Sequence, residues 1–270
     1  MRAAASGPNL SSTTDRLPAV GGILEIEKRA FGAWPAAECV ALGGWRLRAT
    51  GGVTRRGNSV WPGAASGLPL AEAVAAAERF YAARGAPVRF QLFPGAEPGG
   101  LDAALAERGY EPESPVSVQT AEAAEVARAT AGAAGFETRA APRCSAEWWS
   151  VAGERSRFAG VQDVYRALLA RVGPRAGYVL ARRDGEPVAT ALGVAEGEWA
   201  GVFSMLTLPA WRGRGAGRSL LAALARWAEE QGARRLYLQV ERDNPAALGL
   251  YARAAFRERY GYHYRLLAKG

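Results

Sequence analysis

The chain has few of the residues on which hydrolytic and metal chemistry depend. It contains one histidine, His263, and two cysteines, Cys39 and Cys144, in 270 residues. A Ser-His-Asp triad would have to use His263, and a zinc site built from several histidines is excluded. Two isolated cysteines are too few for a disulfide framework or a thiolate metal site. We therefore expect no bound metal and interpret both cysteines as packing residues.

Long apolar runs are also missing. No segment approaches the roughly 20 consecutive apolar residues that a membrane helix requires. Residues 1–15 lack the charged-then-apolar pattern of a signal peptide, and we expect residues 1–20 to form a flexible tail rich in small and polar residues. The sequence therefore predicts a cytoplasmic protein that does not bind a membrane.

Lysine is nearly absent, because only Lys28 and Lys269 occur and arginine supplies the rest of the net charge of +8. The arginines are spread among acidic residues, whereas nucleic-acid binders usually cluster basic residues along one face. We expect no nucleic-acid partner. A nucleic-acid binder is kept as an alternative, and a steep salt dependence of binding to DNA or RNA would reveal it.

The densest basic cluster lies in a glycine-rich turn between an apolar strand-like segment and an amphipathic helix. Such glycines let the backbone approach a phosphate, and the helix adds the positive end of its dipole. A Walker loop needs Lys-Ser/Thr after its last glycine, but Arg218-Ser219 stands here. A dinucleotide motif stays open, since Glu241 follows at a suitable distance. The residues predicted to hold the phosphates are Arg212, Gly213, Arg214, Gly215, Ala216, Gly217 and Arg218.

The segment downstream of this turn continues in a recognisable order. Residues 236–240 alternate as a strand, Asn244-Pro245 is a helix start, and Leu250-Tyr251 leads to Phe256. Together with the Arg-x-x-Gly-x-Gly turn, residues 203–267 resemble the cofactor-binding half of the GNAT family of N-acetyltransferases. Alanine occupies position 255, where the family's Leu-Tyr-x-x-x-Gly-Phe segment has glycine.

The resemblance implies acetyl-CoA as cofactor and assigns roles around it. Backbone N–H groups of Met205 or Leu206 would bind the thioester and pantetheine where the fourth strand separates from the fifth. Asn244 would position the pantetheine or a water, and Tyr251 would protonate the coenzyme A sulfur, the alternative being a core tyrosine. The general base stays open among three acids, which are Glu196, Glu198 and Glu241.

The chain also resembles itself, because residues 70–110 echo residues 220–256. The earlier copy has Pro62–Gly67 in place of the arginine-rich loop, so we expect it to bind no cofactor; chance similarity is the alternative. We predict a degenerate GNAT-like domain over residues 21–120, an alanine-rich linker or short surface helix over 121–135, and an acetyl-CoA-binding GNAT domain over 136–270. The predicted fold class is α/β (α+β), with a mixed, mostly antiparallel twisted sheet flanked by helices.

The opening of the chain resembles bacterial two-part acetyltransferases with a divergent first half. That resemblance lets Trp45, Arg55, Arg56 and Asn58 reach the acceptor pocket; the alternative is a core tryptophan and solvated arginines. We expect direct acetyl transfer, in a ternary complex, to a primary amine of a small or medium-sized acceptor, an antibiotic being one candidate. A non-catalytic acyl-CoA sensor and a protein N-acetyltransferase stay open, as does the choice between monomer and homodimer.

Overall fold

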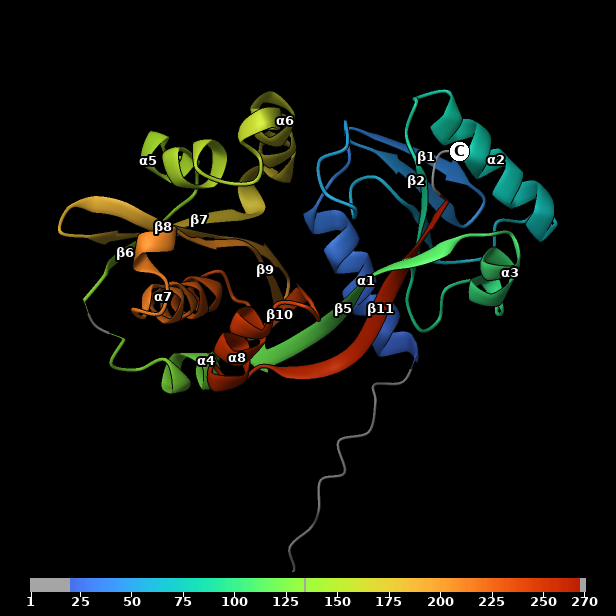
Figure 1. Ribbon diagram of the computed structural model, residues 1–270. Helices are drawn as coiled ribbons and strands as arrows, with labels where there is room; N and C mark the ends of the chain where they lie inside the picture. The colour runs from blue at the N-terminus through green and yellow to red at the C-terminus, as the bar shows by residue number, and fades with distance from the viewer. Residues whose placement is uncertain (1–19, 134, 268–270) are drawn as a thin grey trace, which may run out of the picture.

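The computed structural model describes residues 20–133 and 135–267 and contains one sheet of eleven strands, ordered β1-β2-β3-β4-β11-β5-β10-β9-β8-β7-β6 (Figure 1). Neighbouring strands are antiparallel except for β3 with β4 and β9 with β10. The predicted fold class is confirmed. The strands are β1 (Glu38–Leu42), β2 (Trp45–Ala49), β3 (Val60–Pro62), β4 (Val88–Leu92), β5 (Glu111–Glu122), β6 (Glu137–Ala141), β7 (Ala176–Arg183), β8 (Glu186–Glu196), β9 (Trp199–Thr207), β10 (Arg235–Glu241) and β11 (Arg257–Leu267).

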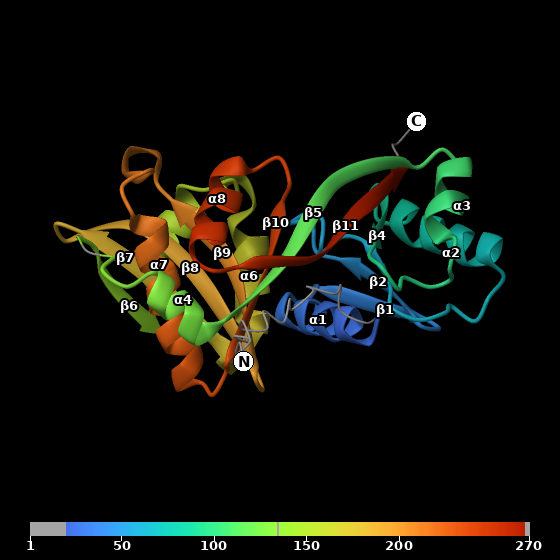
Figure 2. The same cartoon turned by 90° about the horizontal axis from the view of Figure 1, so that it is seen from below.

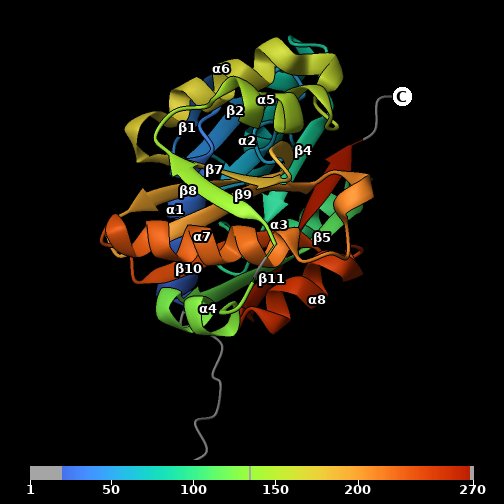
Figure 3. The ribbon, with the colours of Figure 1, turned by 90° about the vertical axis from the view of Figure 1, so that its left-hand side faces the viewer.

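Helices cover the sheet in three groups. The helices are α1 (Val20–Ala33), α2 (Leu70–Ala82), α3 (Leu101–Glu107), α4 (Ala123–Ala129), α5 (Ala146–Trp149), α6 (Gln162–Val172), α7 (Ala216–Glu230) and α8 (Pro245–Arg253). Helices α5 and α6 lie on one side of strands β6 to β9, and α4, α7 and α8 lie on the other (Figure 3). Helices α2 and α3 pack on β2 to β4, while α1 contributes to the same core as α5 and α6. In residues 20–133 and 135–267, no helix has both the length and the apolar character needed to cross a membrane.

Helix α7 packs closely on the sheet because small residues make room for its one large aromatic side chain. Leucines and alanines at helical spacing form its buried face, as the sequence predicts for residues 218–231. Trp227 lies against Gly177 of β7 and Gly193 of β8, where an added Cβ would come within 2.2 Å of the indole ring. The two glycines therefore determine how near α7 lies to the strands.

The two halves of the chain share strands. Strand β5, from the first half, pairs with both β10 and β11. Strand β11, from the end of the second half, pairs with β4 (Figure 2). The division at residues 121–135 stays a prediction, to which the structure adds that α4 lies in this segment and buries Ala123 and Val126. Of the predicted tail, residues 1–19 lie outside the described residues.

Because β5 and β11 pair with strands of the other half, a hydrophobic core forms between the two halves. Helix α1 contributes Ile23, Ile26 and Ala30 to it, and β9 and β10 contribute Phe203 and Tyr237. Successive residues of β4 separate this core from the one under α2 and α3, because Phe90 belongs to the latter while the Gln91 side chain reaches α1. One face of β9 and β10 therefore packs against residues of the first half.

Candidate active site

Strands β9 and β10 separate to form a wedge. They pair only over residues 199–202 and 235–238, although both strands continue beyond this point. Opposite β8, Ser204 and Met205 together face one residue, Ala191, and Ser204 has a positive φ of 48°. This bulge bends β9 away from β10. The predicted separation of these strands is confirmed, and Met205 and Leu206 lie on β9 beyond the last residue paired with β10.

The glycine-rich turn leads into α7 at the predicted place. Gly213 and Gly215 have φ values of 70° and 96°, which favour glycine, and Gly215 is the N-cap. An added Cβ at Gly213 would meet nothing within 4 Å. At Gly217 it would lie 2.8 Å from Leu250 Cδ2 of α8. Two glycines thus shape an open turn at a helix N-terminus, and the third permits close packing of α7 and α8.

Three arginines surround this helix N-terminus. Arg212 Nε donates to the carbonyl of Thr207 at 3.2 Å, and Arg218 donates to the carbonyl of Ala131. The Arg214 guanidinium lies 5.4 Å from the ring centre of Trp211. Within the described part of the chain, none of the three forms an ion pair with a carboxylate. Uncompensated positive charge and a helix dipole at one point fit a pyrophosphate group.

Asn244 and Tyr251 lie on α8. Asn244 Oδ1 accepts the N–H of Ala247 at 3.1 Å, so the predicted helix start is confirmed and this oxygen is used as the N-cap. Tyr251 is 7% exposed and stacks edge-on against Phe256 at 5.8 Å, and its hydroxyl makes no hydrogen bond within residues 20–133 and 135–267. Burial raises the pKa of Tyr251 to about 12, so the phenol is protonated at neutral pH. Ala255 takes the positive φ of 67° where the GNAT segment has glycine.

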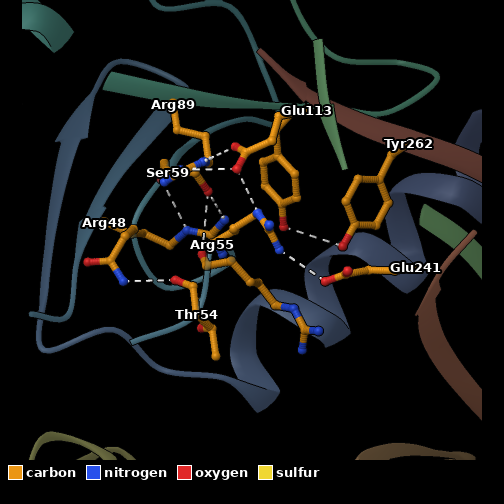
Figure 4. A network of polar contacts seen from close by, with 11 residues as sticks. Arg48, Thr54, Arg55, Ser59, Arg89, Glu113, Glu241 and Tyr262 are labelled. Carbon is orange, nitrogen blue, oxygen red and sulfur yellow. Dashed lines mark hydrogen bonds and ion pairs between the residues drawn. The ribbon is translucent and has the colours of Figure 1, made fainter. Parts of the chain in front are cut away.

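Glu241 ends β10 at the open side of the wedge and contacts an arginine of the first half. Arg55 Nη1 donates to Glu241 Oε1 at 3.0 Å, and Arg55 Nε donates to Glu113 Oε1 at 2.9 Å (Figure 4). Arg89 donates to the other oxygen of Glu113 at 2.7 Å. Although burial opposes it, hydrogen bonds from Arg89 and Arg55 lower the pKa of Glu113. Arg55 therefore bridges β5 and β10 beside the open end of the wedge.

The two other acids considered as bases lie at the closed end of the wedge. Glu196 pairs with Arg175 at 3.0 Å, and Glu198 pairs with Arg235 at 3.4 Å. Arg235 is the residue of β10 opposite Trp199, where the two strands are still paired. Of the three candidates, Glu241 is the one beside the open end.

Trp45 and Asn58 have structural positions. Trp45 is fully buried, packs edge-on against Phe90 at 5.5 Å and donates its indole N–H to the carbonyl of Glu97 at 2.8 Å. The expectation that Trp45 reaches the acceptor pocket is corrected: it belongs to the core under α2 and α3. Asn58 accepts the N–H groups of Thr50 and Gly52 and donates to two carbonyls of the same loop. Asn58 therefore holds the loop that carries Arg55.

One functional candidate, the buried acid Glu27 of α1, was not identified from the sequence. Glu27 is 1% exposed, accepts the hydroxyl of Tyr260 at 2.7 Å and accepts the side-chain amide of Gln91 at 2.9 Å. Burial raises the pKa of Glu27, and the charges of Arg48 and Arg56 oppose that rise. The available signal was its spacing, because Glu27 lies on the same helical face as Ile23 and Ala30.

Comparisons with known proteins converge on one family. Residues 143–256 match the profile described as "Acetyltransferase (GNAT) family". The chain is 33% identical over 248 residues to the Bacillus subtilis protein named "Uncharacterized N-acetyltransferase YobR", a match that covers 90% of this chain and 98% of that protein.

Solved structures share the fold. A GCN5-related N-acetyltransferase from Kribbella flavida superposes with a TM-score of 0.67 at 21% identity, covering 94% of this chain and 98% of that one. A tandem GNAT protein from the clavulanic acid biosynthesis pathway superposes with a TM-score of 0.57 at 16% identity, covering 73% and 69%. The second of these has two GNAT units in one chain, in line with the predicted two-part architecture.

Proposed function

Since the chain belongs to the GNAT family of N-acetyltransferases, we propose that it transfers the acetyl group of acetyl-CoA to a primary amine of a small or medium-sized acceptor, by direct attack in a ternary complex. The observation that carries this proposal is the wedge between β9 and β10. The glycine-rich N-terminus of α7 lies on one side of these strands, and Glu241 and Arg55 lie at the open end of β10.

Acetyl-CoA would supply the activated acyl group as a thioester. Its pyrophosphate would lie on the turn at residues 212–218, where backbone N–H groups and the guanidinium groups of Arg212, Arg214 and Arg218 supply positive charge. Backbone N–H groups of Met205 or Leu206, beside the bulge, would stabilise the charge that develops on the carbonyl oxygen.

Tyr251 and Glu241 would handle the protons. A phenol whose pKa is raised to about 12 keeps its proton at neutral pH and can donate it to the departing thiolate. Glu241 would accept the amine proton, directly or through a water, because its side chain is 39% exposed beside the wedge. These two proton-handling groups favour an enzyme over an acyl-CoA sensor, which would need neither.

Two measurements on one preparation test the proposal. Isothermal titration with acetyl-CoA measures cofactor binding, and release of free thiol measures transfer to a panel of aminoglycosides, polyamines, amino acids and peptides. Binding with amine-dependent thiol release supports the proposal. Binding without release from any amine would favour the sensor, and a lack of binding would refute the cofactor assignment.

A further inference from the structure

Arg56 is a cation in an aromatic environment without a carboxylate partner. Its guanidinium lies 5.6 Å from the ring centre of Trp34 and 5.2 Å from that of Phe203, the last residue of β9 before the bulge. Its Nε is buried without a hydrogen-bond acceptor, and Arg56 forms no ion pair within the residues that the structure describes. A buried N–H donor without a partner is unfavourable unless a ligand or water supplies the missing acceptor.

Gln239 presents a second unpaired donor on β10. Its Oε1 accepts the hydroxyl of Tyr262 at 3.4 Å, while its Nε2 is buried without a partner. Arg56 lies on the same side of the sheet, because its guanidinium contacts Phe203, which belongs to the same core as Tyr262. Because side chains alternate along a strand, Gln239 and Glu241 project from the same face of β10.

Arg48 adds a second positive charge near Arg56. It is 1% exposed and donates to Ser59 and Gln91, but its Nη1 has no partner. Burial lowers the pKa of Arg48, and the nearby charge of Arg56 lowers it further. Glu27 also feels both charges, but it already accepts hydrogen bonds from Tyr260 and Gln91. An anion beside Arg56 would therefore reduce the repulsion between the two guanidinium groups and accept the unpaired Nε–H of Arg56.

Arg56 Nε, Gln239 Nε2 and Arg48 Nη1 are all N–H donors without an acceptor. Guanidinium groups bind carboxylates through short, charge-assisted hydrogen bonds. Residues two apart in a strand are about 7 Å apart. An amine and a carboxylate separated by several carbon atoms, as in an ω-amino acid, span that distance, with the carboxylate near Gln239 and the amine near Glu241.

We propose that Arg56 and Gln239, supported by Arg48, bind a carboxylate of the acceptor, so that the acceptor is an amine that carries a carboxylate several carbon atoms away. This inference rests on the proposed function, because the amine must lie at the wedge beside Glu241. Through Arg56, the first half of the chain would then select the acceptor.

The test compares carboxylated amines with their decarboxylated counterparts. ω-Amino acids are paired with the alkylamines of the same chain length. Thiol release gives kcat/KM, and calorimetry on the CoA-loaded protein gives Kd. The variants are Arg56→Gln, Arg56→Lys and Gln239→Leu, with Arg84→Gln as control, because Arg84 pairs with Glu38 of the edge strand β1. Thermal unfolding verifies that each variant is folded.

We expect wild type to favour the carboxylated partner by about 10- to 100-fold, the range for hydrogen bonds to a charged group. Arg56→Gln abolishes most of this preference, Arg56→Lys retains part of it, and Arg84→Gln retains all of it. The preference is a ratio measured on one sample, so a partly unfolded variant does not change it.

Each outcome has a distinct meaning. Transfer to amines without a preference for carboxylates, or a preference that Arg56→Gln leaves intact, overturns this inference while the proposed function stands. Carboxylated amines that bind in an Arg56-dependent manner without thiol release support the anion site and refute acetyl transfer to them. If no carboxylated amine in the panel binds the CoA-loaded protein, the inference is overturned irrespective of turnover.

Discussion

Tyr251→Phe removes one hydroxyl from α8 and leaves the ring that packs against Phe256. Because that hydroxyl makes no hydrogen bond within the described residues, we expect the free energy of unfolding to change by less than about 0.5 kcal/mol, below the contribution of a typical hydrogen bond. Loss of a general acid, in contrast, should lower kcat by about 100-fold or more. The KM for acetyl-CoA should stay nearly constant, since no phosphate contact is removed.

The matched control is Tyr81→Phe. Tyr81 is also buried, but its hydroxyl donates to the carbonyl of Arg48 at 3.0 Å and lies 3.3 Å from the Arg48 N–H. We expect this variant to lose about 1 kcal/mol of stability, since it leaves a buried carbonyl with fewer partners, and to keep kcat. Urea unfolding and thiol-release kinetics at saturating substrates measure both quantities.

The pH dependence sharpens the test. Because burial raises the pKa of Tyr251 to about 12, the phenol stays protonated throughout the neutral range. Any decline of kcat as pH rises towards 9 must therefore come from another group. An unchanged kcat for Tyr251→Phe at saturating substrates would refute the assignment of Tyr251 as the proton donor.

Three further predictions concern stability and cofactor binding. Burial raises the pKa of Glu27 in the folded state, so wild type should lose stability as pH rises above about 4.5, with a slope of at most about 1.4 kcal/mol per pH unit. Glu27→Gln should flatten this slope in unfolding titrations, and equal slopes for wild type and variant would contradict the assignment of Glu27 as a buried acid. Gly177→Ala should destabilise the fold by about 1–3 kcal/mol in urea, because its Cβ would lie 2.2 Å from Trp227, and a neutral result would show that α7 can move. Arg214→Gln should raise the KM for acetyl-CoA by about 3- to 10-fold with kcat unchanged, most strongly at low salt; an unaltered KM would remove Arg214 from the phosphate site.

Local signals in the sequence located the elements of the second half. The apolar spacing of residues 218–231 predicted a helix found at Ala216–Glu230, and Asn244-Pro245 marked the start of α8. The glycines at 213 and 215 indicated a positive-φ turn. Capping, helical periodicity and glycine backbone freedom act over a few residues, so one sequence is enough to place them. The candidate cofactor turn could be predicted because its residues are consecutive.

Contacts between distant residues followed from the tertiary structure alone. Arg55 reaches Glu241 across 186 positions, and Tyr260 reaches Glu27 across 233, because β5 lies between β10 and β11. Local periodicity carries no information about which strands exchange between the two halves. Trp45 shows the same limit, since a tryptophan fits a pocket or a core and only its packing against Phe90 decided between them. The sequence by itself determined the family, the main elements of the second half and the glycine-rich turn. The pairing of β5 and β11 across the two halves, which depends on long-range contacts, determined which residues of the first half face the wedge.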